Sequence, residues 1–283
     1  MAKYSIITCV SRSDVYKSCL IDSVNKNRKN HDIDFIPIIN NDNRYSASNA
    51  LNIGIDASKS EYLIFAHQDV RLLDNWFDKV DEVIEALPEQ WGILGSAGID
   101  IQYGRKDIGK WGGSLSTQTV AVGSVWDSDA NLSLPPYWDG VKDPTQVHCI
   151  DECLFIVNKK TGLRFDATFT GFHFYGVDIC LQARAAGYQI YSAHLPMIHY
   201  GQYSASFSGD RKYWVYFRYL HHKWHRRFPE LLGTHMHWAE DELTSYISIG
   251  MEDDNGVAIQ LRAMGIEKAK LSNDRERGFI EEV

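Results

Sequence analysis

Short apolar runs alternate with amphipathic segments along the first third of the chain, and this alternation restricts the fold more than any other feature. The runs are rich in Ile, Val and Phe, as in strands buried on both faces of a parallel sheet. They predict strands at residues 4–10, 35–39, 62–66 and 91–97. Helical periodicity between them predicts helices at 14–27, 48–58 and 76–87, the second beginning near Ser46 or Ser48. This order favours an α/β fold of three layers with a mainly parallel sheet.

The remainder of the chain is less regular. Residues 98–146 are rich in Gly, Ser, Asp and Pro, which predicts loops and short strands bordering a site. Regular patterns then predict a strand over 149–158, a helix over 176–187 and a short strand over 189–193. Beyond Gly209 the composition changes to Tyr, Trp, His and Arg. We therefore expect a main domain over residues 1–205 and a helical C-terminal extension over 206–283.

Charge and hydropathy argue against several classes of protein. The net charge is −8 at pH 7 and no long run of Lys and Arg occurs, which disfavours a nucleic-acid-binding protein. The first apolar run is too short for a signal peptide, and no window resembles a membrane-spanning helix. Five scattered cysteines, an odd number, are typical of free thiols in a reducing compartment. We expect a cytoplasmic protein.

Polar residues follow three of the predicted strands. Ligands of parallel α/β sheets bind beyond the carboxyl ends of the strands, and this rule places Ser11, Asn40 and Asp69 at one edge. Asp69 comes directly after the buried run 62–66 and is positioned to hold a divalent cation. The alternative is that Asp69 caps a helix or ends the strand in a turn.

Other segments match simple patterns with less structural support. Asp127-Ser128-Asp129 and Asp32-Ile33-Asp34 are literal Asp-x-Asp sequences, but neither follows a buried strand, so we interpret both as solvated loops. The glycines of Trp111-Gly112-Gly113 could let backbone N–H groups approach a phosphate, although an ordinary turn accounts for them better.

Four segments carry a more specific signal. They are SIITCVSR at 5–12, SNALNIGI at 48–55, YLIFAHQDV at 62–70 and GVDICLQARAAGY at 176–188. In order and spacing they resemble the family-2 type of glycosyltransferase with the GT-A fold, over roughly residues 3–201. The resemblance implies an inverting hexosyl- or deoxyhexosyltransferase of glycan or polysaccharide biosynthesis. Such an enzyme uses a nucleotide-diphosphate sugar and Mn²⁺ or Mg²⁺.

The resemblance also implies roles for individual residues. The family's Asp-x-Asp falls on His67-Gln68-Asp69, so that the first acid is His while Asp69 keeps the position that touches metal. His199 resembles a C-terminal histidine of the family that can complete the metal site or contact the diphosphate; a lone His beside an apolar run is otherwise more often structural. The positions implied for nucleotide binding are Thr8, Val10, Ser11, Arg12, Asn40, Asn41, Asn49, His67 and Gln68.

The position of the catalytic base departs from the family. Where the family has adjacent Glu and Asp, this sequence has Tyr175-Gly176. The candidates for the base are Asp151, Asp178, His173 and Glu152, of which Asp151 and Asp178 are favoured, followed by His173. A base must lie within hydrogen-bond reach of the acceptor hydroxyl, which a sequence does not reveal. Each of these residues also has an ordinary structural alternative as a helix cap or core hydrogen-bonding group.

The segment 211–228 mixes aromatic residues with Lys, Arg and His. Such a mixture suits a peripheral membrane interface and a lipid-linked glycan acceptor, but a helix that packs its aromatic side chains on the main domain explains it better. Two other functions stay open. A nucleotidyltransferase would need a Gly-rich basic loop after the first strand, where Ser11-Arg12-Ser13-Asp14 stands. A non-catalytic nucleotide- or carbohydrate-binding protein would account for the missing acids.

Overall fold

A nine-stranded sheet forms the centre of the protein, in the order β2-β1-β3-β10-β5-β11-β9-β6-β7. The computed structural model describes residues 2–73, 75–100, 121–126, 144–201, 211–228, 231–232, 237–238, 269–271 and 280–282. The strands are β1 (Tyr4–Val10), β2 (Ile33–Ile39), β3 (Tyr62–Ala66), β5 (Trp91–Gly95), β6 (Ala97–Asp100), β7 (Ala121–Gly123), β9 (Thr145–Ile150), β10 (Leu154–Asn158) and β11 (Gln189–Ser192).

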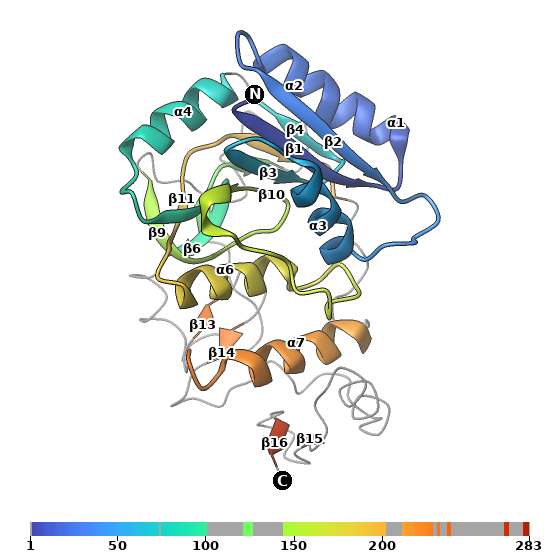
Figure 1. The fold of residues 1–283 in the computed structure, drawn as a ribbon, viewed down its shortest axis with the longest axis vertical. Coiled ribbons are helices and arrows are strands. Elements are labelled where there is room, and N and C mark those ends of the chain that lie inside the picture. The colour runs from blue at the N-terminus through green and yellow to red at the C-terminus, as the bar shows by residue number, and fades with distance from the viewer. Residues whose placement is uncertain are drawn as a thin grey trace.

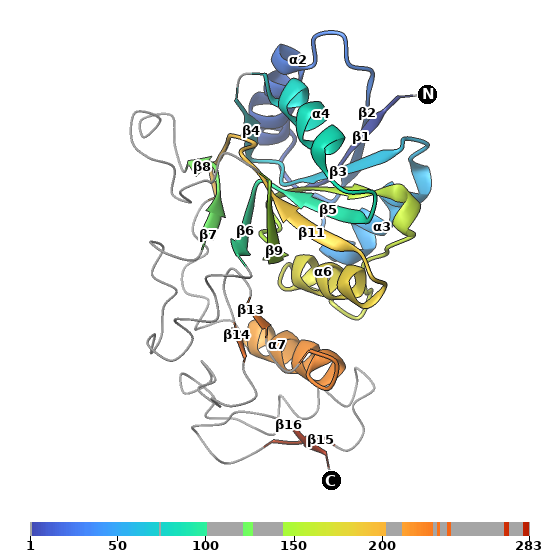
Figure 2. The ribbon, with the colours of Figure 1, turned by 90° about the vertical axis from the view of Figure 1, so that its left-hand side faces the viewer.

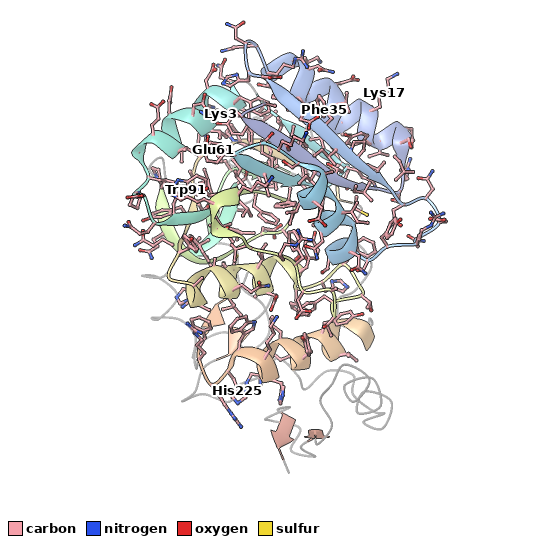
Figure 3. All side chains as sticks on the ribbon, viewed as in Figure 1. Lys3, Lys17, Phe35, Glu61, Trp91 and His225 are labelled. Carbon is pink, nitrogen blue, oxygen red and sulfur yellow. The ribbon has the colours of Figure 1, made fainter. Side chains whose placement is uncertain are left out.

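Most strands of this sheet point the same way. β1 pairs in parallel with β2 and β3, and β11 pairs in parallel with β5. β10 runs antiparallel between β3 and β5. Lys3, Glu61 and Trp91, at the amino ends of β1, β3 and β5, lie along one side of the sheet in Figure 3. The carboxyl ends of these strands therefore meet at the opposite edge, as the sequence predicts for a mostly parallel α/β sheet.

Helices cover both faces of the sheet (Figures 1 and 2). On one face lie α4 (Trp76–Ala86) and a continuous helical segment made of α1 (Ser13–Val15), the π-helical η1 (Tyr16–Ile21) and α2 (Asp22–Asn27). On the other face lie α3 (Ala47–Ala57) and α6 (Tyr175–Ala185). The Ser46 hydroxyl caps α3 by accepting from the Asn49 amide at 3.3 Å. A separate apolar core fills the space on each face, which confirms the three-layer α/β prediction.

A second, smaller sheet extends one end of the first. Its strands, in the order β4-β12-β8, are β4 (Val70–Leu72), β12 (Met197–His199) and β8 (Val125–Trp126). β12 runs antiparallel to β4, with His199 opposite Val70. The chain therefore returns to the end of β3 more than a hundred residues after leaving it, a contact that no local pattern encodes.

The predicted strand over 149–158 is two strands separated by a turn. β9 ends at Ile150 and β10 begins at Leu154. The Asp151 carboxylate accepts a hydrogen bond from the Cys153 amide at 3.0 Å, which closes the turn, and the Asp151 amide donates to the Ala97 carbonyl at 2.8 Å. Asp151 and Glu152 consequently lie in a fixed turn rather than at the start of a strand.

Within the segment predicted as a C-terminal extension, the structure has the helix α7 (Arg211–Trp224), which packs outside α6 (Figure 2). Its side chains Tyr216, Phe217 and Leu220 are buried in the same core as α3 and α6. Beyond α7 the described residues form two short antiparallel pairs, β13 (Leu231–Leu232) with β14 (His237–Trp238), and β15 (Ala269–Leu271) with β16 (Ile280–Glu282). No helix within the described ranges is long and apolar enough to cross a membrane.

A network of buried ionic contacts joins α7 to the main domain. Lys223 donates to Asp166 at 2.6 Å and to Asp178 at 2.8 Å. Tyr219 also donates to Asp166 at 2.7 Å, and the Trp224 indole donates to Asp178 at 2.7 Å. Burial opposes the charge on Lys223, but the two carboxylates raise its pKa. The described side chains Tyr219, Lys223 and Trp224 thus serve the packing of this helix on the main domain.

Asp166 should make the stability of the protein depend on pH in the acid range. Burial opposes its charge, yet Lys223, the Thr168 amide and Tyr219 lower the pKa of Asp166 to about 2. Because the folded-state pKa lies below the unfolded value of 3.8, this contribution is complete above about pH 4 and is lost as the pH falls toward 2. Urea unfolding of Asp166→Asn should show a shallower loss of stability over this range.

The difference should not exceed about 2 kcal/mol, because the carboxylate is partly exposed and solvent screens it. Asp32→Asn, at an exposed position just before β2, is the control and should reproduce the slope of the unchanged protein. An Asp166→Asn variant as acid-sensitive as the unchanged protein would show that the α7 contacts do not set this dependence.

Candidate functional site

A pocket of about 320 Å³ opens at the carboxyl ends of β1 and β3. Polar and apolar residues both line it, and they include the carboxyl end of β3, the first half of α3 and the first residue of α6. The lining residues are Cys9, Ser11, Asn40, Asn43, Ala47, Leu51, Phe65, Ala66, His67, Gln68, Asp69, Glu152, Phe172 and Tyr175. This is the edge at which the sequence places a ligand site.

Two strands converge to build the polar end of the pocket. His67, Gln68 and Asp69 form the turn between the buried strand β3 and β4. The His67 amide donates to the Cys153 carbonyl at 2.8 Å, which fixes the turn to the start of β10. The antiparallel pairing of β4 with β12 brings His199 alongside, and the Tyr200 amide donates to the Asp69 carbonyl at 3.1 Å.

His67, Asp69 and His199 form a compact group of possible metal ligands. His67 Nδ1 and His199 Nε2 lie 3.3 Å apart, and His199 Nε2 lies 3.5 Å from Asp69 Oδ1. One ligand atom from each of the three side chains lies within 4.8 Å of the others. Atoms that share one ion at about 2.0–2.2 Å are separated by distances of this size. The group therefore fits a divalent cation.

Electrostatics around the three side chains also suits a cation. Burial and the nearby His199 lower the pKa of His67 to about 4, so its ring is neutral at pH 7 and can offer a lone pair. Burial opposes the charge on Asp69, but the hydrogen bond to His199 lowers the pKa of its carboxyl. Burial likewise opposes the charge on His199, while Asp69 raises its pKa. The site thus contains an anionic carboxylate beside two imidazoles.

The ring of His67 is held from its far side. Its Nε2 lies 2.8 Å from the hydroxyl of Tyr175, the first residue of α6, while its Nδ1 faces His199. Metal-binding histidines generally engage their second ring nitrogen in this way, because the contact fixes the tautomer and the orientation of the ring. Tyr175 therefore has a definite positioning role that its place in the sequence did not reveal.

Gln68 ties the two strand ends together. Its carbonyl oxygen accepts from the Ser11 amide at 3.0 Å and the Arg12 amide at 2.8 Å, and its amide nitrogen donates to the Ser11 hydroxyl at 2.9 Å. The middle residue of the turn thus fixes the chain that leaves β1. Predicted nucleotide contacts at Ser11, His67 and Gln68 all lie on the pocket wall.

Other predicted nucleotide contacts are placed differently. Asn40 lines the pocket, but its side chain is hydrogen-bonded to the backbone of Tyr45. Its Oδ1 accepts from the Tyr45 amide at 2.9 Å, and its Nδ2 donates to the Tyr45 carbonyl at 2.9 Å. It therefore shapes the loop after β2. The remaining predicted positions do not line the pocket: Thr8 and Val10 are fully buried, whereas Arg12, Asn41 and Asn49 are exposed.

The candidates for a catalytic base separate clearly. Asp178 is fully buried between Lys223, Trp224 and Gln182 and does not line the pocket, so its carboxylate is engaged inside the protein. Asp151 closes the β9–β10 turn, and neither it nor His173 lines the pocket. Its neighbour Glu152 does line the pocket.

The weaker patterns of the sequence play no part in this pocket. Asp32 lies just before β2 and Asp34 near its start. Both are exposed, and neither lines the pocket. Asp127-Ser128-Asp129 and Trp111-Gly112-Gly113 lie outside the described residues.

Comparison with known proteins identifies the family. Residues 5–218 match the family described as "Glycosyltransferase like family", a match that spans most of the chain. The chain belongs to the glycosyltransferase-like family. This confirms the resemblance drawn from the four sequence segments.

A curated relative of the chain is similar to it over about half of its length. A curated protein of Fuscovulum blasticum, "ATP synthase subunits region ORF 6", is 29% identical over 150 residues. That alignment spans 51% of this chain and 53% of the relative, about half the length of each.

Solved structures support the GT-A fold. The structure of GalNAc-T7 with UDP, GalNAc and Mn²⁺ is similar with a TM-score of 0.53 and 11% identity, over 94% of this chain and 55% of that one. A Drosophila β1,4-galactosyltransferase 7 complex with manganese, UDP-Gal and xylobiose gives a TM-score of 0.41 and 10% identity, over 69% of this chain and 65% of that one. At this identity the first likeness concerns the fold alone, and no argument rests on the second.

The burial of Asp178 predicts that its replacement will affect stability rather than ligand binding. Asp178→Asn leaves Lys223 with a single carboxylate partner and should lower the free energy of unfolding by about 2–3 kcal/mol, somewhat less than for a fully buried pair. Urea unfolding measures this change. Asp56→Asn, which breaks the exposed contact with Arg164, should have little effect. Equal stabilities of the two variants would contradict the role assigned to Asp178.

Proposed function

We propose that this protein is a metal-dependent glycosyltransferase, which transfers a sugar from a nucleotide-diphosphate sugar to an acceptor hydroxyl. The observation that carries the proposal is the group of His67, Asp69 and His199, of which His67 and Asp69 line a pocket at the carboxyl ends of β1 and β3. Family membership supports the same reaction class. The bound metal would neutralise the charge that develops on the departing diphosphate.

For the metal we propose Mn²⁺ rather than Mg²⁺. Two imidazole nitrogens and one carboxylate make up the ligand group. Mg²⁺ prefers oxygen ligands, whereas Mn²⁺ and later transition metals accept imidazole more readily. With three ligands from the protein, further coordination positions are left for the oxygens of a diphosphate.

The rest of the pocket supports a site for the nucleoside. Its floor includes Leu51 and Phe65, both buried, and Phe172 stands at the pocket with 53% of its surface exposed. An exposed aromatic ring at the edge of an apolar pocket offers a surface on which a nucleobase can stack. We infer that the diphosphate lies toward Asp69 and Ser11, and the base toward Phe172 and the start of α3.

The acceptor, the stereochemistry and the location are further parts of this proposal. We propose a glycan or lipid-linked glycan acceptor and inversion at the anomeric carbon, both supported by the resemblance to family-2 glycosyltransferases. We also propose a cytoplasmic location with peripheral contact to the inner membrane face; the five free thiols support the cytoplasmic part.

Replacement of Asp69 tests the metal site. Asp69→Asn should lower Mn²⁺-dependent turnover at least ~100-fold, because a preorganised charge at the developing diphosphate is lost. The assay follows release of nucleoside diphosphate from a panel of UDP-, GDP- and dTDP-sugars with Mn²⁺. Thermal unfolding without metal should change little, because His67 remains held by Tyr175.

Asp34→Asn, at an exposed position on β2, is the matched control and should retain full activity. Near-normal Mn²⁺-dependent turnover by Asp69→Asn would contradict the placement of the metal. If the unchanged protein binds none of the three nucleoside diphosphates in calorimetry with Mn²⁺, a non-catalytic carbohydrate-binding role would be favoured instead.

A further inference from the structure

The pocket contains two carboxylates among its described lining residues, Asp69 and Glu152. Asp69 belongs to the metal group with His67 and His199. Transfer of a sugar to a hydroxyl also needs a group that accepts the hydroxyl proton, since an alcohol is a weak nucleophile. Glu152 is the carboxylate on the pocket wall that the metal group does not use.

The side chain of Glu152 is held in a fixed position by two elements. The turn that carries it is closed by the contact of Asp151 with the Cys153 amide at 3.0 Å. Glu152 Oε2 then accepts a hydrogen bond from the Gly176 amide at 3.0 Å, in the first turn of α6. The positive end of the helix dipole favours the carboxylate anion at this point. A general base is effective when it is held in this way before the reaction begins.

The shape of α6 is matched to Glu152. Gly176 has no side chain, and a Cβ at this position would lie 2.6 Å from Glu152 Cβ and 3.1 Å from Glu152 Oε2. Atoms of these types do not approach so closely, so the glycine creates the space that the carboxylate fills. The turn between β9 and β10 therefore brings an acid to a place where α6 itself has none.

We propose that Glu152 is the catalytic base of the transfer, an inference that rests on the proposed glycosyltransferase function. The acceptor hydroxyl gives its proton to the Glu152 carboxylate as its oxygen forms a bond to the anomeric carbon of the donor. The bond from the anomeric carbon to the diphosphate oxygen breaks, and its electron pair leaves with the nucleoside diphosphate. Hydrogen bonding to Gly176 holds the acid in place throughout.

Glu152→Gln separates this role from a purely structural one. The Gln side-chain oxygen can still accept from the Gly176 amide, so the cap on α6 survives while the base is lost. We expect turnover to fall by about 10²–10⁴-fold. Binding of nucleoside diphosphate with Mn²⁺ and the temperature of thermal unfolding should both be unchanged. Glu61→Gln, an exposed acid at the opposite edge of the sheet, is the matched control and should keep full turnover (Figure 3).

Moving the acid to α6 provides a second test. The Glu152→Gly substitution removes the two side-chain atoms that would overlap a Cβ at position 176. The Cα of residue 152 then lies 3.4 Å from that Cβ, an ordinary contact distance. The pair Glu152→Gly with Gly176→Asp should therefore fold and recover at least ~10-fold in turnover over Glu152→Gly alone. Gly176→Asp alone should be destabilised, because its Cβ overlaps Glu152.

The possible outcomes are distinguishable. Unchanged turnover in Glu152→Gln would overturn the inference and leave Glu152 as a cap of α6. A folded pair variant that binds nucleotide but gains nothing over Glu152→Gly would also count against it. Absence of nucleoside diphosphate binding by the unchanged protein would instead overturn the proposed function itself.

Discussion

The antiparallel pairing of β4 with β12 is the interaction on which the site depends. β4 continues directly from the turn that carries His67 and Asp69, and the pairing places His199 opposite Val70. Without it, a single carboxylate and a single imidazole would remain at the end of β3. The ligand group therefore exists because two segments far apart in the sequence share backbone hydrogen bonds, which define the spacing of their side chains more closely than loops could.

Two carboxylates of this protein illustrate how position decides function. Asp69 follows a buried strand at the carboxyl edge of the sheet, where a ligand can reach it. Asp178 lies within α6 and is fully buried, where Lys223 and the Trp224 indole complete its hydrogen bonds. The same chemical group belongs to the proposed cation site in one case and attaches the helix α7 in the other, because only the first is accessible from the pocket.

Much of the fold could be predicted from the sequence, because β1, β3 and β5 are continuous apolar runs and α3 and α4 show helical periodicity. The position of Asp69 at the pocket edge of the sheet could be predicted for the same reason, since this residue closely follows the buried strand β3. The burial of Asp178 could not, because it depends on helix packing against distant partners: Trp224 lies 46 residues further on, and Lys223 is its neighbour in the sequence. The contact of Tyr175 with His67 is equally non-local, across 108 residues.

The turn at Asp151-Glu152 shows why pattern alone misplaced the acids. Apolar residues on both sides of this pair make 149–158 look like one strand, but the Asp151 side chain accepts from the backbone two residues on, in a turn that separates β9 from β10. In this turn the Asp151 carboxylate is engaged by the Cys153 amide, whereas Glu152 lines the pocket. A carboxylate can reach this part of the pocket either from the β9–β10 turn or from the first turn of α6. The turn can supply it only if the facing position of α6 has no side chain. Gly176 on α6 meets that condition.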